Sequence, residues 1–215
     1  MTGRTATCPN CGAAVVFLWS GAVQTTCEYC RSVLVRHDVE LERVGVAGDV
    51  PPDSSPVQRG TVGTWRGRGF TVVGRIVYEH DRGGWNEWHL RTTGGVSAWL
   101  SDAQGDLALS SPATQPTELP PADHIQVGQS YAIDGLLFKV ASLTRARYAG
   151  VEGELPFESW DRSEALFADL DSDGSGDAPR FATIDYSDGE PVAYVGEYVA
   201  LEQLAPRNLR QFEGW

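Results

Sequence analysis

Most of the chain consists of short apolar runs, rich in β-branched and aromatic residues, that are separated by glycine and proline. Residues 70–78 form one such run, and residues 96–100 form another directly after a glycine turn at 93–95. Runs of this length, bounded by turn residues, predict β-strands and hairpins. Only residues 163–170 show apolar spacing that predicts a helix, with Ser163 as its N-cap. We therefore expect an all-β fold with at most one short helix.

The strand pattern occurs twice along the chain. Residues 57–111 and 122–205 each contain an aromatic-bearing strand after a glycine, then a hairpin with a glycine turn, then a short apolar strand. This repetition predicts two tandem small β-barrel or sandwich-like units, packed side by side in a body that spans residues 57–215. Residues 38–56 end in a proline-rich stretch, which predicts a linker.

The four cysteines of the chain form two C-x-x-C pairs, Cys8 with Cys11 and Cys27 with Cys30. Two such pairs at this separation predict a structural Zn²⁺ site in a ribbon over residues 1–37, because each pair supplies two thiolates to a tetrahedron. Four thiolates leave no position for a reactive water. The alternative is a disulfide or redox pair, but no export signal marks the sequence for an oxidising compartment.

Charge and hydropathy narrow the classes of partner and location. The net charge is −12, and residues 150–215 hold fifteen acidic and four basic side chains. Because nucleic-acid binding depends on Lys and Arg, this acidic chain with Lys139 as its single lysine argues against nucleic acid as partner. A cationic ligand or basic protein segment fits better, and a role in solubility is the alternative. No run has the length for membrane insertion, so we expect a cytoplasmic protein.

One acidic segment has the pattern of the start of a calcium loop. Carboxylates occupy loop positions one, three, five and nine, and Gly174 occupies position six. Position twelve is Arg180, where such a loop has a bidentate glutamate. We expect a mobile acidic loop, with weak binding of calcium or another cation as the alternative, at Asp169, Asp171, Asp173 and Asp177.

A second cluster places two indoles, a carboxylate and an imidazole within five residues. In an extended strand Trp85, Glu87 and His89 share one face, while Trp88 points to the other. We treat these four residues as a candidate binding patch. Motifs for nucleotide binding and for activated serine nucleophiles are absent from the sequence. We expect a non-catalytic adaptor with a protein partner; the alternative is an enzyme that uses Glu87, His89 and Asp185 in a pocket.

Four phrases of the chain resemble a known bacterial family: the CPNCG of the ribbon, GRGFTVVGRIVYEHDRGGWNEWHL at 67–90, EGELPF at 152–157 and FATIDYSDGEP at 181–191. Together they resemble the domain of unknown function 4178 over nearly the whole chain. The resemblance implies an association with polyamine-synthase-like enzymes and with membrane-remodelling proteins of the phage-shock type. It implies no catalytic residues.

Overall fold

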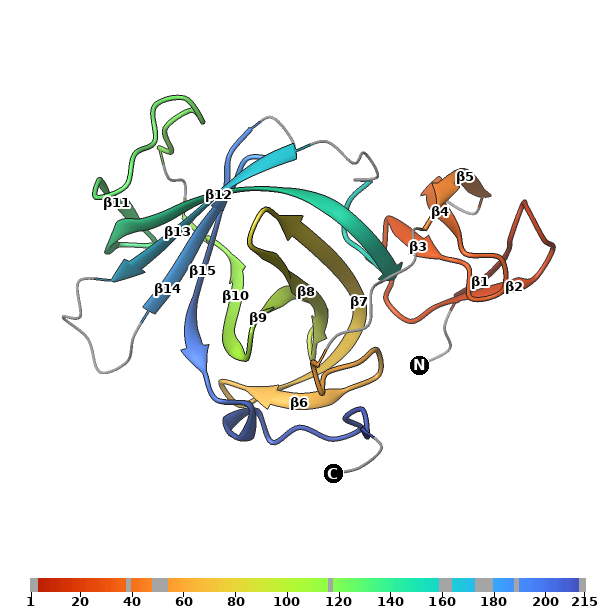
Figure 1. The fold of residues 1–215 in the computed structure, drawn as a ribbon. Helices are drawn as coiled ribbons and strands as arrows, with labels where there is room; N and C mark the ends of the chain where they lie inside the picture. Colours follow the sequence, from red (N-terminus) through yellow and green to blue (C-terminus); the bar gives the residue numbers. More distant parts are fainter. Residues whose placement is uncertain are drawn as a thin grey trace.

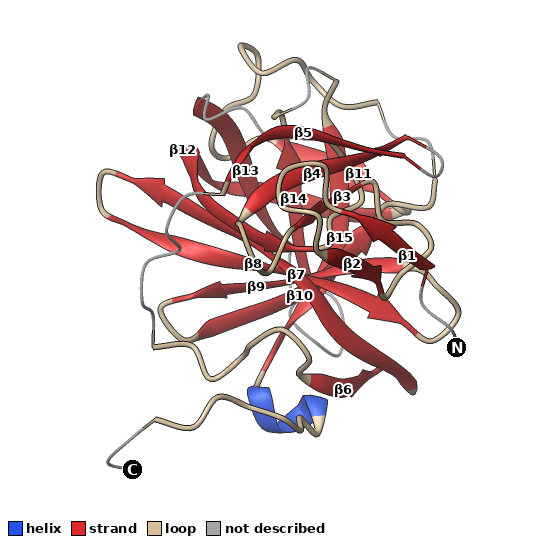
Figure 2. Cartoon of the chain, turned by 90° about the vertical axis from the view of Figure 1, so that its right-hand side faces the viewer, coloured by secondary structure: helices blue, strands red, loops and turns tan. Residues whose placement is uncertain are grey.

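The computed structural model describes residues 4–37, 40–47, 54–115, 118–158, 164–172, 180–187 and 190–212. Within these ranges the regular elements are strands and one short 3₁₀-helix, η1 (Leu201–Leu204), so the all-β prediction is confirmed (Figure 2). None of the helical structure in the described ranges is long and apolar enough to span a membrane.

The predicted helix at 163–170 is wrong. Strand β13 (Glu164–Ser172) occupies this segment. Its side chains are buried on both faces, since Leu166 and Leu170 pack in one cluster and Phe167 packs in another. A strand that is buried on both faces lacks the polar–apolar alternation that separates a strand from a helix in sequence.

The N-terminal module contains two small antiparallel sheets. Strands β1 (Arg4–Thr7) and β2 (Ala14–Phe17) form the first, and β3 (Gln24–Thr26), β4 (Ser32–His37) and β5 (Glu40–Val46) form the second. The linker prediction is therefore wrong for residues 40–46. The burial pattern of β5 explains the miss, because most of its side chains are exposed and give little strand signal.

The body is one ten-stranded antiparallel sheet. In chain order its strands are β6 (Val62–Trp65), β7 (Arg68–His80), β8 (Gly83–Thr92), β9 (Ser97–Ala103), β10 (Asp106–Pro112), β11 (Ser130–Ile133), β12 (Leu136–Gly153), β13, β14 (Arg180–Asp185) and β15 (Val192–Val199). Because β7 pairs with β12 and β10 pairs with β15, strands β7–β10 and β12–β15 close into a barrel (Figure 1).

The strands of the two predicted units follow the same local plan. The β6–β7 hairpin turns at Arg66 and Gly67, with φ of 49° and 72°, and the β11–β12 hairpin turns at Asp134 and Gly135, with φ of 49° and 76°. Two successive positive φ angles define the type I′ turn that suits tight hairpins. The same backbone bonds recur: Gly60 N to Val72 O at 2.9 Å and Gly128 N to Val140 O at 2.8 Å.

The two units nevertheless share one barrel, which corrects the side-by-side arrangement. The short strand β6 pairs with the start of β7, and the short strand β11 pairs with the start of β12. The later parts of β7 and β12 pair with each other. The junction between β10 and β15 is tightly packed, since a Cβ atom at Gly196 of β15 would clash with the Leu109 carbonyl oxygen of β10. Each unit alone would leave edge strands unpaired, and pairing across both junctions removes those edges.

The barrel strands carry apolar side chains on both faces. Inside, Ile76 and Tyr78 belong to one cluster. Outside, one cluster includes Trp88 and Leu204 of η1, and another includes Phe138 and Ile125 of the segment before β11. Side chains from all eight barrel strands meet at the inner face.

Candidate functional site

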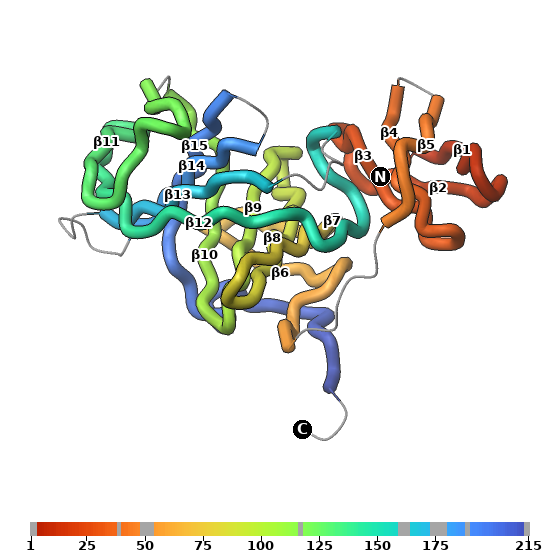
Figure 3. Tube along the Cα trace, turned by 45° about the horizontal axis from the view of Figure 1, so that its top comes forward, coloured from red at the N-terminus to blue at the C-terminus, as the bar shows by residue number. Residues whose placement is uncertain are grey.

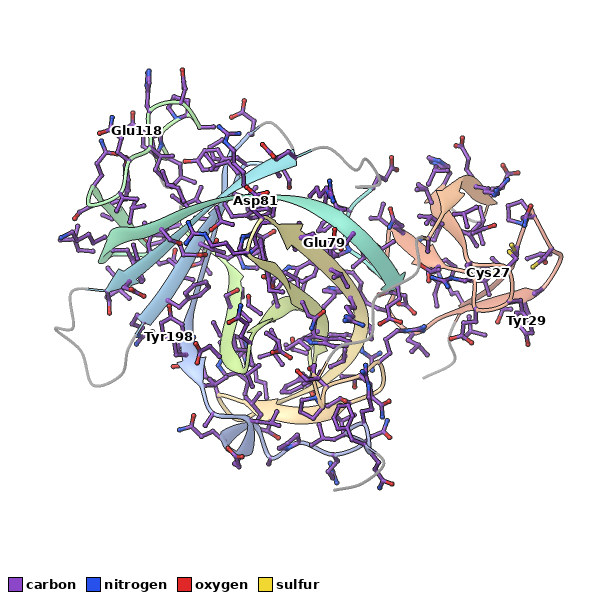
Figure 4. The ribbon with its side chains drawn as sticks, viewed as in Figure 1. Cys27, Tyr29, Glu79, Asp81, Glu118 and Tyr198 are labelled. Atoms are coloured by element: carbon purple, nitrogen blue, oxygen red, sulfur yellow. The ribbon has the colours of Figure 1, made fainter. Side chains whose placement is uncertain are left out.

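The cysteines converge as their spacing predicts. The four Sγ atoms lie within 4.8 Å of one another, with Cys8 and Cys30 3.7 Å apart and Cys11 and Cys27 3.8 Å apart (Figure 4). A tetrahedral Zn²⁺ with Zn–S bonds of about 2.3 Å requires sulfur separations of about 3.8 Å. The donor set therefore fits a tetrahedral thiolate-bound metal ion.

The two metal knuckles share one backbone geometry. Gly12 N donates to the Cys8 carbonyl at 2.9 Å, and Arg31 N donates to the Cys27 carbonyl at 2.9 Å. Gly12 has a φ of 76° and Arg31 has a φ of 59°. Arg31 stands where the first knuckle has Gly12, and it adopts the left-handed conformation that glycine takes more readily, so the second knuckle keeps the same geometry.

The interior of the barrel holds a cavity of about 340 Å³. All eight barrel strands contribute side chains to its lining, and Phe157 after β12 adds another. The wall is mainly aromatic and consists of Tyr78, Trp85, Trp99, Phe157, Phe167, Phe181, Tyr194 and Tyr198.

The charged side chains of the lining are mainly acidic. Its carboxylates come from β8, β10, β13 and β14, and they are Glu87, Asp106, Asp169 and Asp185. Among the described residues that line the cavity there is no lysine or arginine, and His80 is the single residue of basic type. The cavity therefore presents negative charge inside an aromatic wall.

Burial in the cavity has a large effect on the pKa of Glu87. Its side chain accepts hydrogen bonds from Trp85 Nε1 at 2.9 Å and from Ser101 Oγ at 2.8 Å. Burial nevertheless raises the pKa of Glu87 to about 8, and the nearby charges of Asp169 and Asp185 add to the rise. Burial also raises the pKa of Asp169. At neutral pH the unliganded cavity therefore keeps Glu87 mostly protonated.

His89 lies beside the cavity and does not line it. Its Nδ1 is 2.7 Å from the Glu154 carbonyl oxygen, and its Nε2 is 2.8 Å from Ser97 Oγ. Because a carbonyl can only accept, Nδ1 carries the proton and Nε2 accepts from the Ser97 hydroxyl. Burial lowers the pKa of His89 to about 4, so the ring is neutral. Of the alternative enzyme residues, the cavity gathers Glu87 and Asp185 without His89.

The family model for the Domain of unknown function (DUF4178) matches residues 58–201. The chain belongs to the DUF4178 family. The matched residues include every side chain that lines the cavity, whereas the cysteine ribbon precedes them. No curated protein and no solved structure matches the chain.

In this DUF4178 chain the predicted acidic loop is wrong at its first two positions. Asp169 and Asp171 lie in β13 instead of a loop. Asp169 lines the cavity, and Asp171 accepts a hydrogen bond from the Tyr198 hydroxyl at 3.0 Å. Asp173 and Asp177 lie outside the described residues. The acidic segment thus supplies the cavity and its edge with carboxylates.

The candidate patch on β8 of the DUF4178 domain divides between two faces. Trp85 and Glu87 point into the cavity, whereas Trp88 is buried on the outer face, where the Arg75 guanidinium lies 4.7 Å from its ring. Most of the aromatic wall was not predicted from the sequence. The sequence signal for this wall is that alternate residues of a strand face the same side. Phe181, Thr183 and Asp185 of β14, for example, all point into the cavity.

Proposed function

We propose that this protein is a non-catalytic binding module, whose barrel cavity takes an organic cation and whose ribbon holds structural Zn²⁺. The observation that carries the proposal is the combination of four carboxylates and eight aromatic rings around one cavity, with no lysine or arginine among its described lining. Binding of a protein partner stays a prediction, as does a role in a membrane-stress or polyamine-related system.

The chemistry of the wall favours a cation over a neutral ligand. Aromatic faces attract cations, and Trp and Tyr rings do so most strongly. A buried ammonium group also needs charged hydrogen-bond acceptors to offset the loss of water, and Glu87, Asp169 and Asp185 are placed to supply them. Without a cation, the charges of Asp169 and Asp185 add to the rise in the pKa of Glu87. A bound cation would remove that repulsion.

The depth of the carboxylates favours an elongated ligand. Asp169 is half-buried, whereas Asp171 is exposed on the same face of β13, about 7 Å further along the strand. The half-exposed Tyr198 contacts Asp171 and also lines the cavity, so this end is its mouth. A linear amine with charged groups at both ends would place methylenes against the aromatic wall. Polyamines are the ligand class with this form.

The position of His89 argues against the enzyme alternative. A general base must reach the proton that it abstracts. His89 is buried, and both of its ring nitrogens are engaged by Glu154 and Ser97. Glu87 and Asp185 remain in the cavity as binding groups. Incubation with spermidine followed by mass spectrometry should return the amine unchanged.

Calorimetric titration with spermidine tests the binding proposal. We expect binding of one spermidine per chain that weakens at least tenfold in Asp185→Asn, because the variant removes a charge from the cavity. The matched control is Asp123→Asn, which makes the same change at an exposed position outside the cavity. Equal loss in both variants, or no binding by the native protein, would contradict the proposal.

The raised pKa of Glu87 predicts a pH dependence with a definite sign. The free cavity holds Glu87 protonated below its pKa of about 8, and a bound cation favours the ionised form, so binding releases a proton. Affinity should therefore rise between pH 6 and pH 8, by up to about tenfold per pH unit, while the amine stays charged. The Glu87→Gln variant should bind more weakly and lose this slope. A native affinity that is independent of pH would rule out ionisation of Glu87 on binding.

A further inference from the structure

The ribbon and the barrel meet at a buried carboxylate. Glu154 is 2% exposed, and its oxygens accept hydrogen bonds from the backbone amides of Leu18 at 2.5 Å and Trp19 at 2.8 Å. Burial raises the pKa of Glu154, and these two amide donors oppose the rise. The ribbon thus supplies two backbone hydrogen-bond donors to a buried carboxylate at the end of β12.

Backbone pairing extends this junction. Gln24 N donates to the Leu155 carbonyl at 3.2 Å, and Leu155 N donates to the Gln24 carbonyl at 2.9 Å. The Arg91 guanidinium of β8 donates to the Leu18 carbonyl at 2.8 Å. Figure 3 shows the end of β12 running alongside the ribbon, where β3 lies. Residues 154–155 therefore lie against the edge of the ribbon sheet, where Leu155 pairs with Gln24 of β3.

The same segment builds part of the cavity wall. Phe157 lines the cavity and stacks on Trp99, with 5.8 Å between ring centroids and an interplanar angle of 21°. Trp99 in turn lies 4.9 Å from the His89 ring, and His89 lies 5.0 Å from the Trp19 ring. A continuous layer of rings thus connects the ribbon to the cavity.

We propose that the ribbon positions the wall of the ligand site: Trp19 of the ribbon, together with His89 and Glu154, holds Trp99 and Phe157 in the cavity wall. It follows that Zn²⁺ and the cavity ligand strengthen each other's binding, because coupling between two sites is reciprocal. The inference rests on the proposed function for the identity of the ligand. The positioning of the wall does not depend on the ligand.

Amide exchange tests the positioning directly and without a ligand. Removal of Zn²⁺ with a chelator should speed exchange at residues 97–101 and 154–157, while β13 and β14 keep their protection. Unchanged exchange at 97–101 and 154–157, with the ribbon itself unfolded, would overturn the inference even if the amine binds.

Two substitutions test the effect on the ligand. Trp19→Ala should keep its zinc content and lose affinity for spermidine by about fivefold or more, which is the usual scale of coupling between sites. Glu154→Gln should do the same with a smaller change in size. Tyr29→Ala is the control, because Tyr29 lies on the ribbon at 78% exposure. Spermidine should also slow zinc release from the native protein.

The outcomes separate the two proposals. If the native protein binds spermidine and zinc-loaded Trp19→Ala binds it equally well, the coupling is wrong and the binding module stands. If the native protein binds no amine, the proposed function is wrong, and the exchange experiment alone decides whether the ribbon positions the wall.

Discussion

Replacing Cys27 with serine is expected to unfold the ribbon and leave the barrel folded. Cys27 is buried, and one missing thiolate disrupts a four-ligand site. Structural Zn²⁺ contributes on the order of 10 kcal/mol to a module too small for a large core. The barrel has its own clusters, such as those around Trp88 and Phe138, and these do not include ribbon residues.

Amide exchange with a zinc assay checks this prediction. Residues 4–37 and 40–46 should lose protection and the bound zinc in Cys27→Ser. Tyr29→Ala changes a residue between two cysteines without removing a ligand and should keep both. A loss of protection throughout residues 57–212 in Cys27→Ser would contradict a separately folded barrel.

Replacing Glu87 with glutamine is expected to move stability and binding in opposite directions. The folded protein raises the pKa of Glu87 from 4.5 to about 8. Between these values the unfolded chain is ionised while the folded chain stays protonated, so stability falls as pH rises from about 4.5 to 8. Glutamine does not titrate. Glu87→Gln should therefore be more stable than the native protein at pH 8 by more than about 1 kcal/mol, and similar at pH 4.

Chemical unfolding at pH 4 and pH 8, together with spermidine titration, tests this pairing. If Glu87 served stability, its substitution would destabilise the protein. If it serves ligand binding, its substitution lowers the affinity for the ligand and can leave the protein more stable. Glu118→Gln is the control, because this exposed glutamate lies outside the cavity (Figure 4). A less stable Glu87→Gln protein at pH 8 would show that the native carboxylate is not held in an unfavourable state.

The sequence predicts what depends on local spacing. The positions of Cys8, Cys11, Cys27 and Cys30 suffice to predict their convergence, because each knuckle is a local turn. Alternating and β-branched runs likewise predict the strands. The segment that contains Leu166 and Phe167 was predicted as a helix and is a strand, since burial on both faces hides the strand period.

The cavity depends on long-range pairing and could not be read from spacing. Glu87, Asp169 and Asp185 lie far apart in the chain and meet because β7 pairs with β12 and β10 pairs with β15. No local pattern specifies those two junctions. For the same reason the predicted grouping of Glu87 with His89 on one strand face was only partly informative: the face is shared, but the cavity ends before His89.

The most direct test of the central claim is to follow the tryptophan indole N–H signals by NMR during titration with spermidine. Trp85 and Trp99 line the cavity, whereas Trp65 and Trp88 belong to the cluster on the outer face, so each chain carries its own control. We predict that the Trp85 and Trp99 signals shift and saturate at one spermidine per chain, while those of Trp65 and Trp88 stay in place. Signals of Trp85 and Trp99 that do not respond to spermidine would contradict a cation-binding cavity.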